Sequence, residues 1–168
     1  MKIEIQPMNA ETFAPFGELI DFDREPDFSI NNGMCDRYHA LATSQVKGTN
    51  AQTIISLGRA MPYKLPLELG MMERHPLGSQ AFIPLQKAPF LVVVARDDGG
   101  KPVDPLAFLT RPGQGINYYR NTWHAVLTPL EKAGDYLIVD RAGEEPNLEE
   151  YFFDIPVLID FKSSTTED

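Results

Sequence analysis

The chain has 168 residues, of which 43% are hydrophobic and 23% charged, values typical of one globular domain that buries most of its apolar surface. Fifteen basic against 24 acidic residues give a net charge of −9, so nucleic acid and anionic membranes are not expected as partners. The single cysteine, Cys35, excludes an intrachain disulfide and a cysteine-based zinc site. We expect a cytoplasmic location, which residues 1–5 also favour because they lack the apolar core of a signal peptide.

Short strands bounded by turn residues recur along the chain. Residues 2–6 alternate with period two, Asn9 caps a short predicted helix that ends at Gly17, residues 18–22 form a strand, and residues 23–32 form a loop. Further strands are predicted at residues 53–58, 67–74, 80–84, 90–95, 107–110, 115–119, 123–127 and 136–140. Residues 148–153 are expected to form a short helix, whereas fourteen prolines weigh against long ones.

Many short strands at this spacing predict a mainly β fold, either a sandwich or a barrel. We expect residues 1–162 to form a single domain and residues 163–168 to form a polar C-terminal tail. The chain has no phosphate-cradling glycine loop and no Gly-x-Ser-x-Gly motif, so nucleotide use and serine-hydrolase chemistry have no support.

Two histidines stand in strand-like segments with a carboxylate and an amide close by. Glu73 and His75 are two residues apart and share one face of a predicted strand, and Gln80 lies across a turn. His124 comes from a later strand. A barrel can gather these four side chains around one point, where they suit a divalent metal such as nickel, manganese, iron or zinc. The alternative is that Glu73 is a solvated strand residue and both histidines are structural.

A second group of polar residues follows the turn signal Asn31–Gly33. Arg37 can hold a carboxylate with two parallel hydrogen bonds and His39 can add a third, although an exposed polar strand end is an equal alternative. Of Tyr118 and Tyr119, one is expected to face the barrel interior and the other the outside.

The two histidine segments resemble the paired motifs of the cupin superfamily, whose members are small double-sheet barrels. His75 and His124 match motif histidines, whereas Glu73 replaces a histidine and Gln80 replaces a glutamate. A closer resemblance, to the ureidoglycolate lyases, covers nearly the whole chain. It rests on the segments Ile30–Gly33, Arg37–His39, Glu73–Gly78, Gln80–Pro84, Gly115–Tyr118, Arg120–His124 and Asp140-Arg141.

The resemblance implies a mainly β, cupin-type double-stranded β-barrel of the jelly-roll kind with a few short helices. Residues 1–162 would be a single cupin-like catalytic domain that acts as a homodimer. The implied reaction is the splitting of (S)-ureidoglycolate, a small carboxylate substrate, into glyoxylate and urea in allantoin degradation. The family is associated with a divalent metal, nickel in particular, and no organic cofactor is expected.

This reaction needs a base for the substrate hydroxyl, a proton donor for the departing nitrogen, and a cation for the carboxylate. We expect Glu73 or His124 to be the base and His75 or Tyr119 to be the donor. The expected metal ligands are Glu73, His75, Gln80 and His124. The residues expected to bind the substrate are Arg37, which would hold the carboxylate, and Asn32, His39, Gln80 and Arg141.

Three other functions remain open on the sequence. One is another cupin metalloenzyme, such as a dioxygenase or an isomerase, although these usually have a fuller set of histidines. Another is a cupin that binds a small molecule without catalysis. The third is a hydrolase that acts on the same substrate and releases ammonia, for which the sequence shows no hydrolytic metal centre.

Overall fold

The computed structural model describes residues 1–162, and the predicted tail, 163–168, lies outside the described residues. The elements are β1 (Lys2–Pro7), α1 (Ala10–Phe13), β2 (Gly17–Ile20), β3 (Phe28–Ile30), β4 (Cys35–Arg37), β5 (Gln52–Ala60), β6 (Leu67–Arg74), β7 (Gln80–Pro84), β8 (Phe90–Asp98), β9 (Lys101–Leu109), β10 (Gly115–Tyr118), β11 (Trp123–His124), β12 (Thr128–Pro129), β13 (Gly134–Ala142) and β14 (Glu149–Asp160). No helix within this described part is long and apolar enough to cross a membrane.

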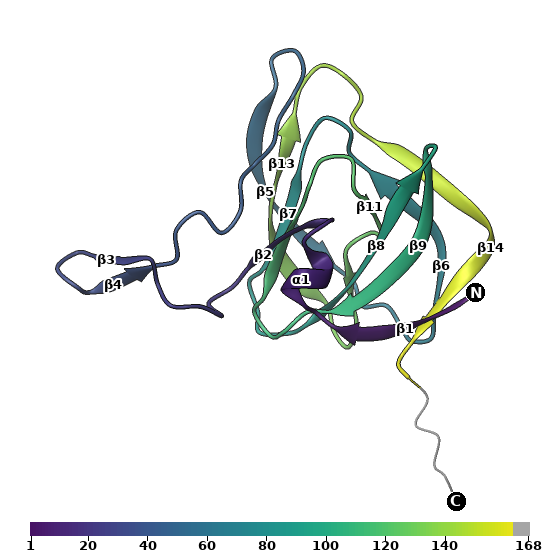
Figure 1. Ribbon diagram of the computed structural model, residues 1–168, viewed down its shortest axis with the longest axis horizontal. Helices are drawn as coiled ribbons and strands as arrows, with labels where there is room; N and C mark the ends of the chain where they lie inside the picture. The colour runs from purple at the N-terminus through teal and green to yellow at the C-terminus, as the bar shows by residue number, and fades with distance from the viewer. Residues whose placement is uncertain (163–168) are drawn as a thin grey trace, which may run out of the picture.

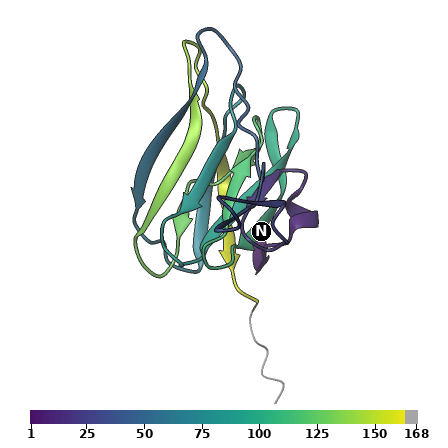
Figure 2. The same cartoon turned by 90° about the vertical axis from the view of Figure 1, so that its left-hand side faces the viewer.

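The strands form two packed sheets and a projecting hairpin (Figure 1). The larger sheet has the order β11-β6-β14-β1-β9-β8-β12, and β11 also pairs with β8, which closes six strands into a ring. The smaller sheet has the order β2-β10-β7-β13-β5. Figure 2 shows β5 and β13 on one side of the molecule and α1 on the other. The expected mainly β barrel of the cupin type is confirmed.

Two apolar clusters form the core. One draws residues from all six strands of the ring, including Ile5, Trp123 and Ile159, and fills its interior. The other lies between the ring and the smaller sheet, where Phe82 and Tyr118 meet residues of β8 and β9. Strand β8 supplies both clusters from its two faces, because successive side chains alternate. Its uninterrupted apolar sequence is that of a strand buried on both sides, and the strand predicted at residues 90–95 is confirmed.

The structure contradicts one prediction made from the sequence near the C-terminus. The predicted helix over residues 148–153 is wrong, because these residues belong largely to β14, which pairs with β6. Tyr151 and Phe153 pack against the cluster inside the ring, and Glu149 forms an ion pair with Arg74. Packing and strand pairing outweigh the local helical preference here, which is a weak influence by comparison.

Two predictions about local structure hold in part. Asn9 caps α1 as predicted, since its side chain accepts hydrogen bonds from the backbone of Glu11 and Thr12. The helix ends at Phe13, earlier than expected: Ala14 keeps helical backbone angles and bonds Ala10, but Pro15 has no N–H group to continue the hydrogen bonds. The predicted loop over residues 23–32 contains β3, which pairs with β4 across the turn at Asn31–Gly33. We call residues 27–39 the arm.

Candidate metal and catalytic site

Glu73, His75 and His124 meet in the layer between the ring and the smaller sheet. Glu73 and His124 are direct partners across β6 and β11, and His75 follows the end of β6. Trp123 faces the interior of the ring, so alternation turns His124 toward the other sheet. One ligand atom from each of the three residues lies within 4.8 Å of the others. Within this group, His75 Nε2 lies 3.9 Å from Glu73 Oε1.

Both imidazoles are held so that the same nitrogen faces the site. His75 Nδ1 lies 2.7 Å from the backbone oxygen of Asn147, and His124 Nδ1 lies 2.9 Å from that of Ala125. A carbonyl oxygen only accepts hydrogen bonds, so each Nδ1 carries a proton and each Nε2 is the nitrogen that faces the site. Both Nε2 atoms are buried and have no hydrogen-bond partner among the described residues. This is the orientation that second-sphere carbonyl groups give to metal-binding histidines.

Burial keeps His124 neutral. Its ring stacks on Tyr118, with centroids 4.3 Å apart and planes 9° apart. Loss of solvent lowers the pKa of His124 to about 3, the bond to the Ala125 carbonyl opposes this effect, and His75 adds to it. Burial, with a smaller contribution from Glu73, raises the pKa of Tyr118, so its hydroxyl stays protonated. At neutral pH His124 therefore offers an uncharged nitrogen.

The carboxyl of Glu73 is shifted in the direction that suits a base. Burial raises the pKa of Glu73, His75 lowers it, and Glu150 raises it further. A carboxylate with a raised pKa takes a proton more readily than one at the surface, and it also binds a cation that relieves its burial.

Gln80 approaches the cluster from the smaller sheet. It stands directly opposite Tyr118 across β7 and β10, so the two side chains share the face that meets His124. Its Oε1 is buried and lacks a hydrogen-bond partner among residues 1–162. Two imidazole nitrogens and a carboxylate thus converge, with the Gln80 amide on the strand face that meets them, and this donor set fits a divalent transition metal.

The opposite face of β6 anchors the strand that carries the site. Arg74, between Glu73 and His75, lies 4.5 Å above the ring of Trp123. Its guanidinium bonds Asp97 at 2.7 Å and Glu149 at 2.6 Å, and its side chain is 13% exposed. Arg74 thus links β6 to Asp97 at the end of β8 and to Glu149 at the start of β14. These links limit how far the flanking residues Glu73 and His75 can move.

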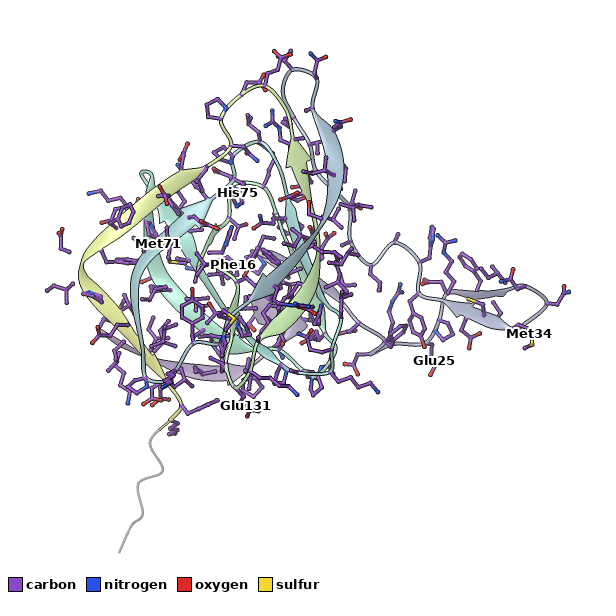
Figure 3. All side chains as sticks on the ribbon, turned by 180° about the vertical axis from the view of Figure 1, so that it is seen from behind. Phe16, Glu25, Met34, Met71, His75 and Glu131 are labelled. Carbon is purple, nitrogen blue, oxygen red and sulfur yellow. The ribbon has the colours of Figure 1, made fainter. Side chains whose placement is uncertain are left out.

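The residues predicted to hold the carboxylate lie elsewhere in this chain. Asn32, Arg37 and His39 are exposed on the arm, which projects from the body of the molecule (Figure 1). Figure 3 shows Met34 at the end of the arm, well away from His75. The structure of the single chain does not bring the arm to the metal-ligand cluster, so the roles of its residues stay predictions.

Tyr119 and Arg141 also lie outside the group of converging metal ligands. Tyr119 lies in an outer groove that includes Glu18 and His39, whereas Tyr118 takes the inner position. Arg141 is buried, and its guanidinium donates to the backbone oxygens of Lys47 and Glu145 and to the Glu145 carboxylate. These contacts hold the two loops beside the cluster. The predicted roles of Tyr119 as proton donor and Arg141 as a substrate contact stay untested.

Two residues near the cluster were not assigned from the sequence. Tyr118 was one of two candidates for the inner position, and only the register of β10 against β7 decides between them. Asn147 binds His75 through its backbone oxygen and accepts a bond from the Leu77 amide through its side chain. No sequence signal points to Asn147, because it acts through a contact 72 residues away along the chain.

The fold and the site together define a cupin-type barrel with a mixed histidine and carboxylate centre. A family model described as "Ureidoglycolate lyase" matches residues 1–160, and the chain belongs to this family. A ureidoglycolate lyase of Chelativorans sp. (strain BNC1) is 55% identical over 158 residues, which cover 94% of this chain and 96% of the relative. "Ureidoglycolate lyase 2" of Rhizobium meliloti (strain 1021) is 50% identical over 159 residues, or 95% and 98% of the two chains.

Proposed function

We propose that this protein is a ureidoglycolate lyase that splits (S)-ureidoglycolate into glyoxylate and urea. The observation that carries the proposal is the cluster of Glu73, His75 and His124 in a chain that belongs to the ureidoglycolate lyase family along residues 1–160. We further propose that the reaction serves allantoin degradation in the cytoplasm.

The reaction is an elimination that consumes no water. The reacting carbon of ureidoglycolate bears a hydroxyl, a carboxylate and a ureido nitrogen. A base removes the hydroxyl proton, the oxygen forms a carbonyl, the carbon–nitrogen bond breaks, and the departing nitrogen takes up a proton to give urea. Each positioned proton transfer contributes about 10²- to 10⁴-fold to the rate.

The cluster holds groups suited to these proton transfers. Glu73, with its raised pKa, and His124, with a free and uncharged Nε2, are the two proposed bases. His75 and Tyr119 are the proposed donors, and of these two His75 belongs to the cluster in the single chain. If a divalent metal is held by Glu73, His75, Gln80 and His124, it would instead polarise the substrate hydroxyl and carboxylate as a Lewis acid. We propose nickel as this metal.

We propose a homodimer in which the arm of one copy reaches the site of the other. The arm projects on the side of β5 (Figure 1), and that side exposes large apolar residues. Met34 on the arm is 86% exposed, and Ile55 and Leu57 on β5 are 71% and 73% exposed. Burial of such residues between two copies favours association. In this arrangement Arg37, assisted by Asn32 and His39, would hold the substrate carboxylate from the second copy.

One assay tests the activity. Metal-stripped protein is incubated with (S)-ureidoglycolate, with and without added nickel, and urea, glyoxylate and ammonia are measured together. Equal amounts of urea and glyoxylate without ammonia are expected. Ammonia in place of urea would indicate a hydrolase, and oxygen uptake would indicate a dioxygenase. Binding of glyoxylate without any turnover of ureidoglycolate would indicate a binding protein.

A further inference from the structure

One carboxylate oxygen, Oδ1 of the half-buried Asp140, is shielded from solvent and has no assigned role. Among the described residues, the buried polar side-chain atoms that lack a hydrogen-bond partner are His75 Nε2, Gln80 Oε1, Gln86 Nε2, His124 Nε2, Tyr136 OH and Asp140 Oδ1. The first, second and fourth belong to the proposed metal ligands, and Gln86 and Tyr136 both lie against Gly134 at the other end of β13. Asp140 remains. A buried carboxylate oxygen without a partner is costly, which points to a group that arrives from outside the chain.

Strand register places Asp140 on the face that meets the cluster. Tyr136 and Ile138 on β13 pack into the core between the sheets, and Asp140 is the next residue on that face. Ile138 stands opposite Phe82 of β7 and Val139 opposite Ala81. Continued by one residue, this antiparallel register brings Asp140 level with Gln80. Gln80 in turn stands opposite Tyr118, which stacks on His124. Asp140, Gln80 and Tyr118 thus form one row across the smaller sheet.

Asp140 lies near the metal-ligand group without joining it. The three residues whose ligand atoms lie within 4.8 Å of one another are Glu73, His75 and His124, and Asp140 is not among them. The adjacent Arg141 points to the opposite face of β13, where it binds Lys47 and Glu145. Oδ1 of Asp140 therefore has no partner among the described residues, and a carboxylate oxygen of this kind accepts hydrogen bonds from a bound molecule.

We propose that Asp140 is a specificity-determining residue that accepts N–H hydrogen bonds from the ureido group of the substrate. This inference rests on the proposed lyase activity. The ureido group carries three N–H donors, one on the nitrogen that departs and two on the terminal nitrogen, whereas glyoxylate has none. The Asp140 carboxylate supplies an acceptor for these donors. A site with such an acceptor rejects analogues that lack the matching donors, because the buried acceptor would stay unpaired.

The experiment compares Asp140→Asn and Asp140→Ala with a matched control, Asp135→Asn. Asp135 lies on the same strand but faces outward, where it pairs with the exposed Arg59. Loss of a charged acceptor is expected to raise the KM for ureidoglycolate about 10- to 100-fold, more in the alanine variant, with a much smaller change in kcat. The inhibition constant of glyoxylate should change less than about twofold, since glyoxylate has no N–H group to lose. Asp135→Asn should alter neither constant.

A substrate analogue gives a second readout that does not depend on one variant. Methylation of the terminal nitrogen removes one N–H donor, so the wild-type protein should lose about 10-fold or more in kcat/KM. In Asp140→Ala the same methylation should cost little further, because its acceptor is already gone. If Asp140→Ala does not fold, as judged by its circular dichroism, Asp140→Asn serves in the same comparison with a partial loss.

Three results would overturn the inference. The first is an unchanged KM in a folded Asp140 variant, and the second is an equal loss of glyoxylate and ureidoglycolate binding. The third is that methylation lowers kcat/KM by the same factor in Asp140→Ala as in the wild-type protein. A failure of the proposed lyase activity is seen separately, since the wild-type protein would then release no urea. With an active wild-type protein, these measurements report on Asp140 alone.

Discussion

Predicted site residues lie in two regions, the metal-ligand cluster and the arm. The cluster is buried and fixed by strand pairing, whereas the arm is exposed. His124 is 1% exposed and is fixed by pairing with β6 on one side and β8 on the other. Arg37 is exposed on a two-stranded hairpin whose strands pair only with each other among the described residues. Ladders on both sides fix the cluster within one chain, whereas the position of the arm relative to a site depends on what it contacts. The fold of one chain therefore defines the geometry of the cluster, whereas the site that the arm serves depends on what the arm contacts.

The largest expected effect comes from the cluster. His75→Ala and His124→Ala should each lower kcat/KM about 10²- to 10⁴-fold, because each removes a positioned nitrogen from the reacting groups. Steady-state release of urea measures this effect. Retention of near-normal turnover by either folded variant would remove that histidine from the site.

The arm should give a smaller effect that can be restored by a second copy. Arg37→Ala is expected to raise KM about 10- to 100-fold, as expected for loss of a charged contact with the carboxylate. If the site is shared, subunits of Arg37→Ala mixed with subunits of His75→Ala form some heterodimers with one intact site. Random mixing should then recover about a quarter of the wild-type activity. No recovery after verified subunit exchange would show that each arm serves its own chain.

The stabilisation of the fold by a bound metal should depend on the cluster and not on the arm. Nickel at about 100 times its dissociation constant should raise the free energy of unfolding by about 2.7 kcal/mol, since it binds only the folded protein. The increase should disappear in His75→Ala and persist in Arg37→Ala, as measured by thermal unfolding with and without nickel. Equal stabilisation of His75→Ala would place the metal outside the cluster.

The effect expected to be smallest per step of the titration is the pH dependence of the metal-free protein. The folded state lowers the pKa of His124 to about 3, whereas the unfolded chain has its ordinary value of 6.5. Between these values the unfolded state binds more protons, so this contribution to stability is complete above pH 6.5 and is lost as pH falls toward 3. The free energy of unfolding should fall by at most about 1.4 kcal/mol per pH unit for this group.

Denaturant unfolding at several pH values measures this slope. The slope should be shallower in His124→Gln and unchanged in His39→Gln, whose side chain is exposed on the arm. Other groups, including Glu73 with its opposite shift, contribute to both proteins and are removed by taking the difference. An identical slope in wild type and His124→Gln would show that His124 does not carry the effect.

Local patterns predicted those features that depend on neighbouring residues. The alternation around Glu73 and His75 placed both on one face, and the run Phe90–Ala95 indicated a strand; the structure agrees with both. The predicted helix over residues 148–153 failed, because Tyr151 and Phe153 are held by packing against the ring. Local preference could not reveal that contact.

The sequence by itself determined the donor types, the strand faces and the family of this chain. These properties follow from side-chain chemistry and from the two-residue period of a strand. Only the tertiary structure decided that His124 lies opposite Glu73, that Tyr118 rather than Tyr119 faces inward, and that Asp140 comes level with Gln80. Each of these depends on register between distant strands, which is set by how both sheets bury their apolar faces together.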